Sequence, residues 1–162
     1  MADSLEEFIM YPVAGGGIES WVAALSRKLF EINQLPSANI VIISGIEPGG
    51  PYVQCIIPHS PGVWNEAVSN KFLADTPWEL SVDQESQLVD LGWNPPSDDP
   101  VDPHELHQTV SNVNWWQAWS APIDTLQLAS LYAATLIAIY GLSENEAWKI
   151  NITDAHCSGC WK

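Results

Sequence analysis

The stretch Asn39-Ile40-Val41-Ile42-Ile43-Ser44-Gly45-Ile46 decides the fold class of this chain. It is rich in β-branched residues, too short for most helices and bounded by turn-forming residues, so we expect a buried strand. The turn 47–51 and the run Tyr52–Ile57 follow it, and together they predict a β-hairpin. The segment Val63–Val68 predicts a third strand, which completes an antiparallel meander.

An amphipathic helix is predicted before this meander. Apolar residues recur at helical spacing from Ile18 to Ile32, and Pro36 lies just beyond the end. After the meander, Ser81 and Gln84 have the spacing of a capping box before another helix.

A long helix is predicted to start after the capping residue Asp124 and to end before Gly141. It is apolar nearly all round, so it is either sandwiched in the core or covered by another subunit. The residues assigned to this core or dimer helix are Leu126, Leu131, Leu136, Ile139 and Tyr140.

The order of elements predicts one α+β domain, an antiparallel β-meander sheet packed by helices, over residues 17–149. Residues 1–16 are expected to lead into it, with a short turn at Ser4–Glu7, and residues 150–162 are expected to form a C-terminal tail. The segment Asn94–Pro103 contains four prolines and is expected to be an exposed loop. Val110–Trp119 is a further strand candidate.

The charge is strongly negative, with 20 Asp and Glu against 5 Lys and Arg, which gives a net charge of −15. Such a field repels phosphate backbones and anionic lipids, so we expect no nucleic-acid or membrane partner. A basic or mixed protein partner fits better, although the acids between Glu66 and Glu105 also fit a solvated, solubilising surface. The acidic N-terminus does not resemble an export signal, so a cytoplasmic protein is expected.

Motifs for catalysis and metal binding are incomplete. The two histidines of His104-Glu105-Leu106-His107 are three residues apart, whereas the zinc-binding helix motif needs four. Cys55 lies within a predicted strand, where cysteine usually behaves as a small apolar residue. The tail residues His156, Cys157 and Cys160 could bind a metal as half of a zinc site, Cys157 and Cys160 could form a disulfide, or the motif could be incidental. We therefore expect no cofactor.

Three tryptophans follow the acidic loop and are candidates for a partner-binding surface. Trp115 and Trp116 are expected to point to opposite faces of a strand, so that one face is core and the other is available for binding. The assigned partner-binding residues are Trp115, Trp116, Trp119, Asp98, Asp99, Asp102 and Glu105. Tryptophans beside acids also fit a hydrolase that acts on carbohydrate, which is the enzyme alternative.

Several segments resemble a known family, the actinobacterial TY-Chap domains, within the secretion-chaperone-like fold that type III secretion chaperones and YbjN-like proteins share. These segments are Tyr52-Val53-Gln54, Glu66-Ala67-Val68-Ser69-Asn70, Leu91-Gly92-Trp93-Asn94-Pro95-Pro96, Asn114-Trp115-Trp116 and the closing helix through Leu142. The resemblance covers roughly residues 17–148. It implies a small, acidic, often dimeric protein that holds a partner, and it implies no catalytic residues.

The expected function is therefore a non-enzymatic, chaperone-like or adaptor-like module that holds a segment of another protein whose identity the sequence does not specify. We also expect a homodimer. The alternatives are a structural protein whose self-assembly is its purpose, and the carbohydrate hydrolase.

Overall fold

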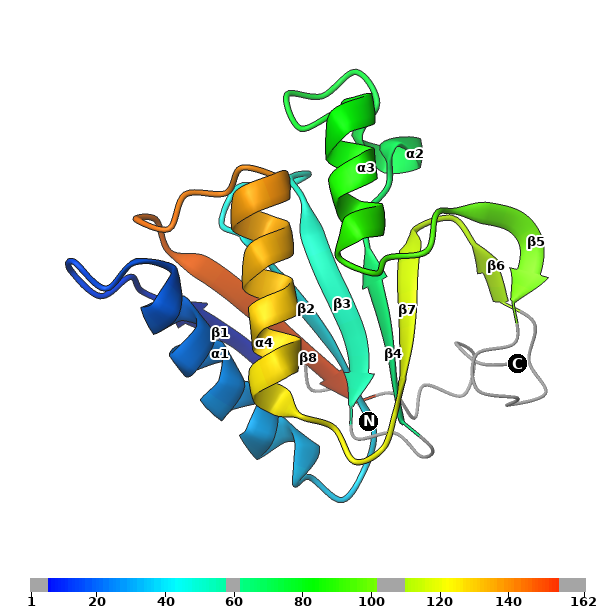
Figure 1. The fold of residues 1–162 in the computed structure, drawn as a ribbon. Helices are drawn as coiled ribbons and strands as arrows, with labels where there is room; N and C mark the ends of the chain where they lie inside the picture. The colour runs from blue at the N-terminus through cyan, green and yellow to red at the C-terminus, as the bar shows by residue number, and fades with distance from the viewer. Residues whose placement is uncertain (1–5, 58–61, 102–109, 155–162) are drawn as a thin grey trace.

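The computed structural model of the chain describes residues 6–57, 62–101 and 110–154. It contains an antiparallel sheet in the order β1-β8-β2-β3-β4-β7 and a separate ribbon of β5 and β6 (Figure 1). The strands of the sheet are β1 (Glu6–Met10), β2 (Asn39–Gly45), β3 (Tyr52–Ile57), β4 (Gly62–Ala67), β7 (Trp115–Ser120) and β8 (Trp148–Asp154). The helices are α1 (Gly17–Asn33), α2 (Asn70–Leu73), α3 (Val82–Asp90), α4 (Thr125–Ala133) and the π-helix η2 (Ala134–Ile139), which continues α4. The predicted α+β fold with an antiparallel meander is confirmed.

The helices α1 and α4 lie side by side on one face of the sheet, and α3 lies beside η2 on the same side (Figure 1). Alternate residues of each strand point toward this helix layer and form the core with it. On β2 and β3 these residues include Val41, Ile43 and Val53, all at most 1% exposed. Trp21 of α1 stacks on Trp148 of β8, with ring centroids 4.3 Å apart.

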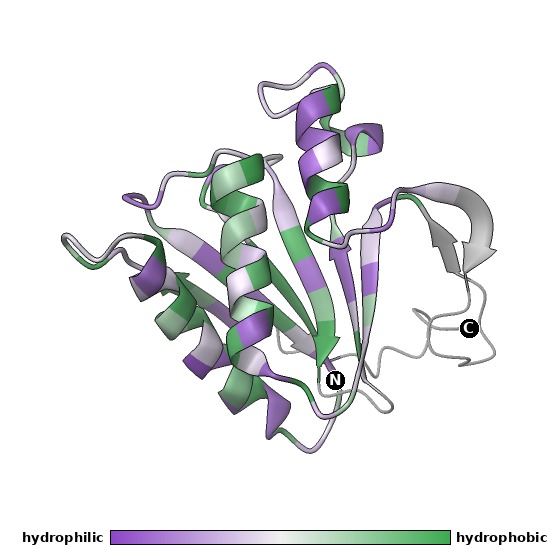
Figure 2. Ribbon diagram, viewed as in Figure 1, coloured by the Kyte–Doolittle hydropathy of each residue, from purple (hydrophilic) through white to green (hydrophobic). Residues whose placement is uncertain are grey.

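The long apolar helix is buried within its own chain. Figure 2 shows α4 and η2 in apolar or neutral colours along most of their length, between α1 and α3. Leu131, Leu136, Ile139 and Tyr140 are at most 9% exposed, whereas Leu126 is 57% exposed. Because sheet and flanking helices cover this helix, its composition does not require a second subunit, and the homodimer stays a prediction.

Side-chain caps fix the ends of these helices as the sequence predicts. Ser81 and Gln84 form the complete capping box of α3, and Asp124 accepts hydrogen bonds from two backbone amides at the start of α4. Gln84 also donates through Nε2 to the carbonyl of Ile139, at 2.7 Å. This bond ties α3 to the end of η2.

Two strands lie outside the predicted domain core. The predicted lead segment contains the edge strand β1 (Glu6–Met10), which overlaps the expected turn Ser4–Glu7 at its last two residues, and β8 crosses the predicted boundary at residue 150. β8 pairs with both β1 and β2, and Ile150 and Ile152 of β8 belong to the core cluster. The sheet thus includes chain from both the predicted lead segment and the predicted tail.

The proline-rich segment is only partly the loop that we expected. Its residues Ser97–Val101 form β5, which pairs with β6 (Val110–Asn112), and the register shifts between Ser97 and Pro100. A two-stranded ribbon has free edges, where a residue without an N–H is tolerated. The predicted strand Val110–Trp119 is accordingly divided into β6 and β7.

In the part of the chain that the structure describes, no helix combines the length and the apolar character needed to span a bilayer.

Candidate functional site

The sheet face opposite α1 and α4 is the candidate site. Among the described helices none lies across this face, and only α2 approaches it, at one end (Figure 1). Strand register brings its side chains into cross-strand rows. One row joins Trp116, Glu66, Gln54, Ile42 and Asn151, and the next joins Ala118, Trp64, Ile56, Ile40 and Thr153. We call these residues, together with Tyr52, Ser44 and Lys149 of the adjoining row, the open face.

Aromatic rings occupy the β4–β7 side of the open face. Trp64 and Trp116 are diagonal neighbours on adjacent strands, and their rings stack at a centroid distance of 5.1 Å with planes 12° apart. Trp64 is 5% exposed, whereas Trp116 is half-buried. A partner that approaches this side therefore meets Trp116 first.

The Glu66 carboxylate lies beside these rings and is half-buried. Gln54 donates to it through Nε2, and the indole Nε1 of Trp64 donates to its other oxygen at 3.3 Å. Both donors are neutral, and the one ion pair recorded among the described residues joins Lys28 and Glu31 on α1. Glu66 therefore presents a negative charge that is held in position and lacks a cationic partner within the described chain.

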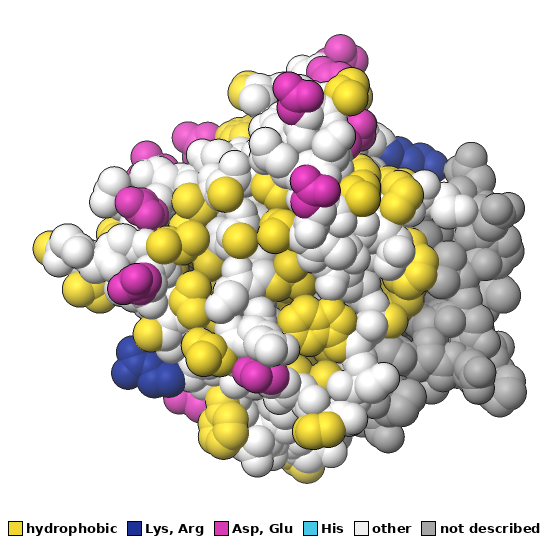
Figure 3. Space-filling view, in the orientation of Figure 1, with side chains coloured by type: hydrophobic (Ala, Val, Ile, Leu, Met, Phe, Trp, Pro, Cys, Tyr) yellow, Lys and Arg dark blue, Asp and Glu magenta, His cyan; other side chains and the backbone are white. Residues whose placement is uncertain are grey.

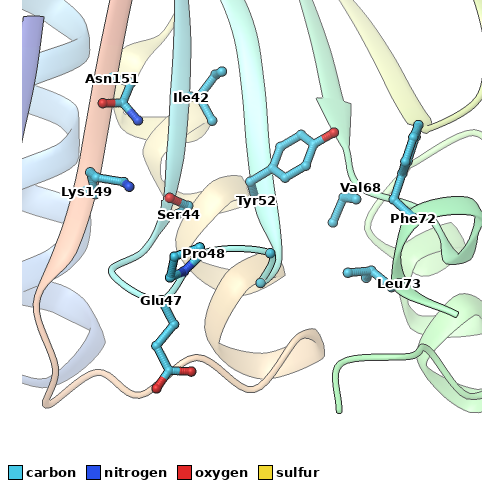
Figure 4. A pocket seen from close by; sticks show the side chains of 12 residues that line it. Ile42, Ser44, Glu47, Pro48, Tyr52, Val68, Phe72, Leu73, Lys149 and Asn151 are labelled. Atoms are coloured by element: carbon cyan, nitrogen blue, oxygen red, sulfur yellow. The ribbon is translucent and has the colours of Figure 1, made fainter. Parts of the chain in front are cut away.

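A hollow of about 300 Å³ lies at the end of the open face nearest α2 (Figure 4). Tyr52 points across it toward Val68 and Phe72, while Lys149 lies on the opposite side, on β8. Ile42 and Leu73 add apolar lining near Tyr52, and Glu47 is an acidic group on the lining. The hollow has room for one side chain of the size of leucine or phenylalanine.

A second, smaller hollow of about 110 Å³ lies between β2, β3 and β4. Ile40, Ile56, Trp64 and Glu66 are among the residues that line it. The open face is therefore uneven, with apolar depressions on both sides of the Gln54–Glu66 hydrogen bond.

The hydroxyl of Tyr52 remains protonated near neutral pH. Burial raises the pKa of Tyr52 above its usual value, and the nearby Glu66 carboxylate raises it further, although a hydrogen bond from Asn114 lowers it. The Asn114 Nδ2 lies 3.5 Å from this hydroxyl. Tyr52 thus offers a ring and a neutral polar group to the hollow.

The predicted tryptophans lie on different sides of the sheet. Trp115 is 4% exposed and belongs to the core, so it does not form part of a surface that a partner could reach. Trp116 is on the open face, as the expected opposite orientation requires. Trp119 points to the helix side, packs against the core and donates through Nε1 to Gln117.

The predicted acidic and metal-binding residues are only partly described. Asp98 and Asp99 lie in β5, away from the main sheet, whereas residues 102–109 and 155–162 lie outside the described residues. Asp102, Glu105, His156, Cys157 and Cys160 fall in these undescribed segments. Within the described chain, no group of three His, Cys, Asp or Glu residues is placed to hold a metal ion.

Cys55 is a buried core residue, as its position in a predicted strand indicated. Burial raises the pKa of its thiol to about 12, so the thiolate is scarce at neutral pH. This environment gives no support to a catalytic cysteine.

The helix side of the molecule has a different surface. Figure 3 shows small apolar groups scattered over it, with acidic side chains around the rim and on the projecting α3 region. Large exposed residues such as Phe30 and Leu126, each 57% exposed, occur there on separate helices. Scattered apolar residues of this kind are ordinary for a protein surface.

A helix layer on one face of an antiparallel sheet and an uneven aromatic surface on the other suit a module that binds protein segments. The family model of TY-Chap3, described as T3SS (YopN, CesT) and YbjN peptide-binding chaperone 3, matches residues 19–147, and the chain belongs to this family of chaperone-like, protein-binding modules. The resemblance inferred from the sequence is confirmed. No curated protein and no solved structure matches the chain.

Proposed function

We propose that the chain holds an extended or amphipathic segment of a partner protein on the open face. The observation that carries this proposal is the apolar and aromatic sheet surface, uncovered by any described helix, in a member of a peptide-binding chaperone family. A bound segment would bury the half-exposed parts of Ile42, Tyr52 and Trp116 further, and removal of apolar area from water favours association.

The partner segment should carry spaced Leu, Ile or Phe residues as anchors. The two hollows accept side chains, and the stacked tryptophans supply a broad apolar platform beside them. Lys or Arg residues near the anchors would be favoured by the net charge of −15, and this contribution should decrease as salt increases.

The proposed role is capture without chemical conversion, and it includes no cofactor. The described residues that gather on the open face carry a carboxylate, amides, hydroxyl groups, the Lys149 amine, aromatic rings and aliphatic chains, and the carboxylate is already bonded to Gln54 and Trp64. Membership of a peptide-binding family supports the same view.

A test compares two aromatic-to-alanine variants of the full chain. Trp116→Ala removes an open-face ring, and Phe30→Ala removes a ring that is exposed on α1 of the helix side. The probes are short peptides with two leucines separated by one residue in a serine and glycine background, titrated by calorimetry. Trp116→Ala should weaken binding roughly tenfold or more, as loss of a buried aromatic anchor does.

The control Phe30→Ala should leave the affinity within about twofold, because isolated exposed residues contribute little. Urea unfolding curves establish that both variants fold. Equal weakening by the two substitutions, or none by Trp116→Ala, would show that the open face is not the binding surface.

The homodimer remains a separate proposal, supported now by the family resemblance rather than by the apolar helix. Light scattering of the purified chain at micromolar concentration measures its mass. A strict monomer would remove this proposal without affecting the open face.

A further inference from the structure

The Glu66 carboxylate has a feature that general peptide capture does not explain. It is half-buried on β4, next to the edge strand β7, where the neutral donors of Gln54 and Trp64 fix it, and no ion pair neutralises it within the described chain. A carboxylate has about four acceptor positions, so two hydrogen bonds leave capacity for a further donor. Arginine suits such a site because its planar guanidinium donates to a carboxylate and stacks on aromatic rings.

The surroundings of Glu66 also favour a cation. The stacked rings of Trp64 and Trp116 lie next to the carboxylate, and the cross-strand register places Trp116 directly opposite Glu66. An arginine side chain that reaches Glu66 would therefore lie against Trp116. On the strands of this face, Lys149 is the one basic residue described, and it lies three strands away on β8.

The distance from Glu66 to the larger hollow fits the repeat of an extended chain. Gln54 is the cross-strand partner of Glu66, and Tyr52 is two residues earlier on β3, so Tyr52 and Glu66 are diagonal neighbours. Diagonal neighbours on one sheet face are separated by roughly 7–8 Å. Side chains at positions i and i+2 of an extended peptide are about 6.6 Å apart and point the same way.

We propose that the open face selects a short extended motif in which an apolar residue enters the hollow beside Tyr52 and an arginine two positions away pairs with Glu66 against Trp116. This inference rests on the proposed peptide capture and specifies the chemistry of the captured segment. Glu47 and Lys149 both line the hollow, so their opposite charges offset each other there, whereas Glu66 has no cationic partner within the described chain and is the site that favours the arginine.

The test uses blocked peptides that differ at one position. The sequence Ser-Leu-Ser-Arg-Ser, acetylated and amidated, is compared with peptides that carry citrulline or glutamate in place of arginine. Citrulline keeps the shape of arginine without its charge. Isothermal titration with the full chain should show the arginine peptide binding roughly five- to tenfold more tightly than the citrulline peptide, and the difference should shrink as salt increases.

Matched variants assign the preference to its residue. In Glu66→Gln, which keeps the size and an acceptor for Gln54 or Trp64, the arginine preference should disappear. In Glu66→Lys the glutamate peptide should bind more tightly than the arginine peptide. Arg27→Gln removes a positive charge from an exposed position on α1, on the helix side and away from Glu66, so it should retain the arginine preference.

The outcomes separate this inference from the proposed function. If arginine and citrulline peptides bind equally and both lose affinity in Trp116→Ala, capture on the open face stands and the arginine motif is wrong. A preference that persists in Glu66→Gln also overturns the motif. If none of the peptides binds, both the motif and the proposed capture of leucine-bearing segments are overturned.

Discussion

Replacing Ile150 with alanine should destabilise the whole domain, because this residue is central to a strand that the sequence analysis left in the tail. Ile150 is 1% exposed, and it lies between Phe8 of β1 and Ile43 of β2 in the strand register. The substitution removes carbon atoms worth about 2 kcal/mol in transfer free energy, and the cavity left behind adds to this. The expected loss in the free energy of unfolding is about 3 kcal/mol.

Urea denaturation followed by tryptophan fluorescence measures this loss as a lower midpoint with an unchanged slope. For a domain of this size the melting temperature should fall by roughly 6–12 °C. Thr153→Ala is the matched control, since Thr153 lies on the same strand but points to the open face and is only half-buried. Its cost should stay below about 1 kcal/mol.

The result that would refute this reasoning is an equal, small effect of the two substitutions. It would mean that β8 does not contribute to the cooperative core, and that the predicted domain of residues 17–149 is sufficient. A large effect of Ile150→Ala alone would extend the folded unit through β8.

Two further predictions concern buried polar groups in the core. Burial raises the pKa of the Cys55 thiol from 9.0 to about 12 and raises the pKa values of Tyr132 and Tyr140. At alkaline pH the folded chain therefore keeps protons that the unfolded chain releases. The free energy of unfolding should be at its full value below pH 9 and should fall as the pH rises toward 12. The midpoint of urea unfolding, measured over this pH range, should decrease with pH, and Cys55→Ala should make this decrease smaller. A midpoint that does not change with alkaline pH would contradict the prediction. Tyr132→Phe removes the hydroxyl that donates to Asn65 Oδ1 in the core, and should cost about 1–3 kcal/mol in urea unfolding because a buried acceptor is left unpaired. Tyr11→Phe, at a residue 75% exposed, should cost almost nothing.

The central strands could be predicted because their evidence is local. A β-branched run, a turn with proline and glycine, and a returning strand lie within residues 39–57, and the resulting β2–β3 pair appears with the expected bounds to within a residue. β8 also alternates, since Trp148, Ile150 and Ile152 point to the core. Its strand partners β1 and β2 are more than a hundred residues earlier in the sequence. The short polar-apolar alternation of β8 becomes a strand through pairing with them, and local sequence does not show this pairing.

The open face was harder to predict because the pairing register of the strands decides which side chains become neighbours on it. Local sequence does not specify this register. Trp116 was proposed from its position after an acidic loop, but its contact with Trp64 depends on the pairing of β4 with β7. Trp115 and Trp119 were assigned to the same binding surface because they are close to Trp116 in sequence. The alternation of side chains along β7 instead points both of them toward the helix side.

The segments that carry the family resemblance connect the fold to the candidate site. The three segments that lie on β3, β4 and β7 divide between the two faces: Val53, Ala67 and Trp115 enter the core, while Tyr52, Gln54, Glu66 and Trp116 lie on the open face. Two of the open-face members contact each other, since Gln54 donates to Glu66, and the buried Asn114 amide of the same segments lies beside the Tyr52 hydroxyl. Core packing alone would explain only the inward members of these segments. Polar residues that bond to each other on a face that no described helix covers need a different reason, and the proposed binding of a segment of another protein supplies one, because that segment would use the same hydrogen-bonded carboxylate and rings as its contacts.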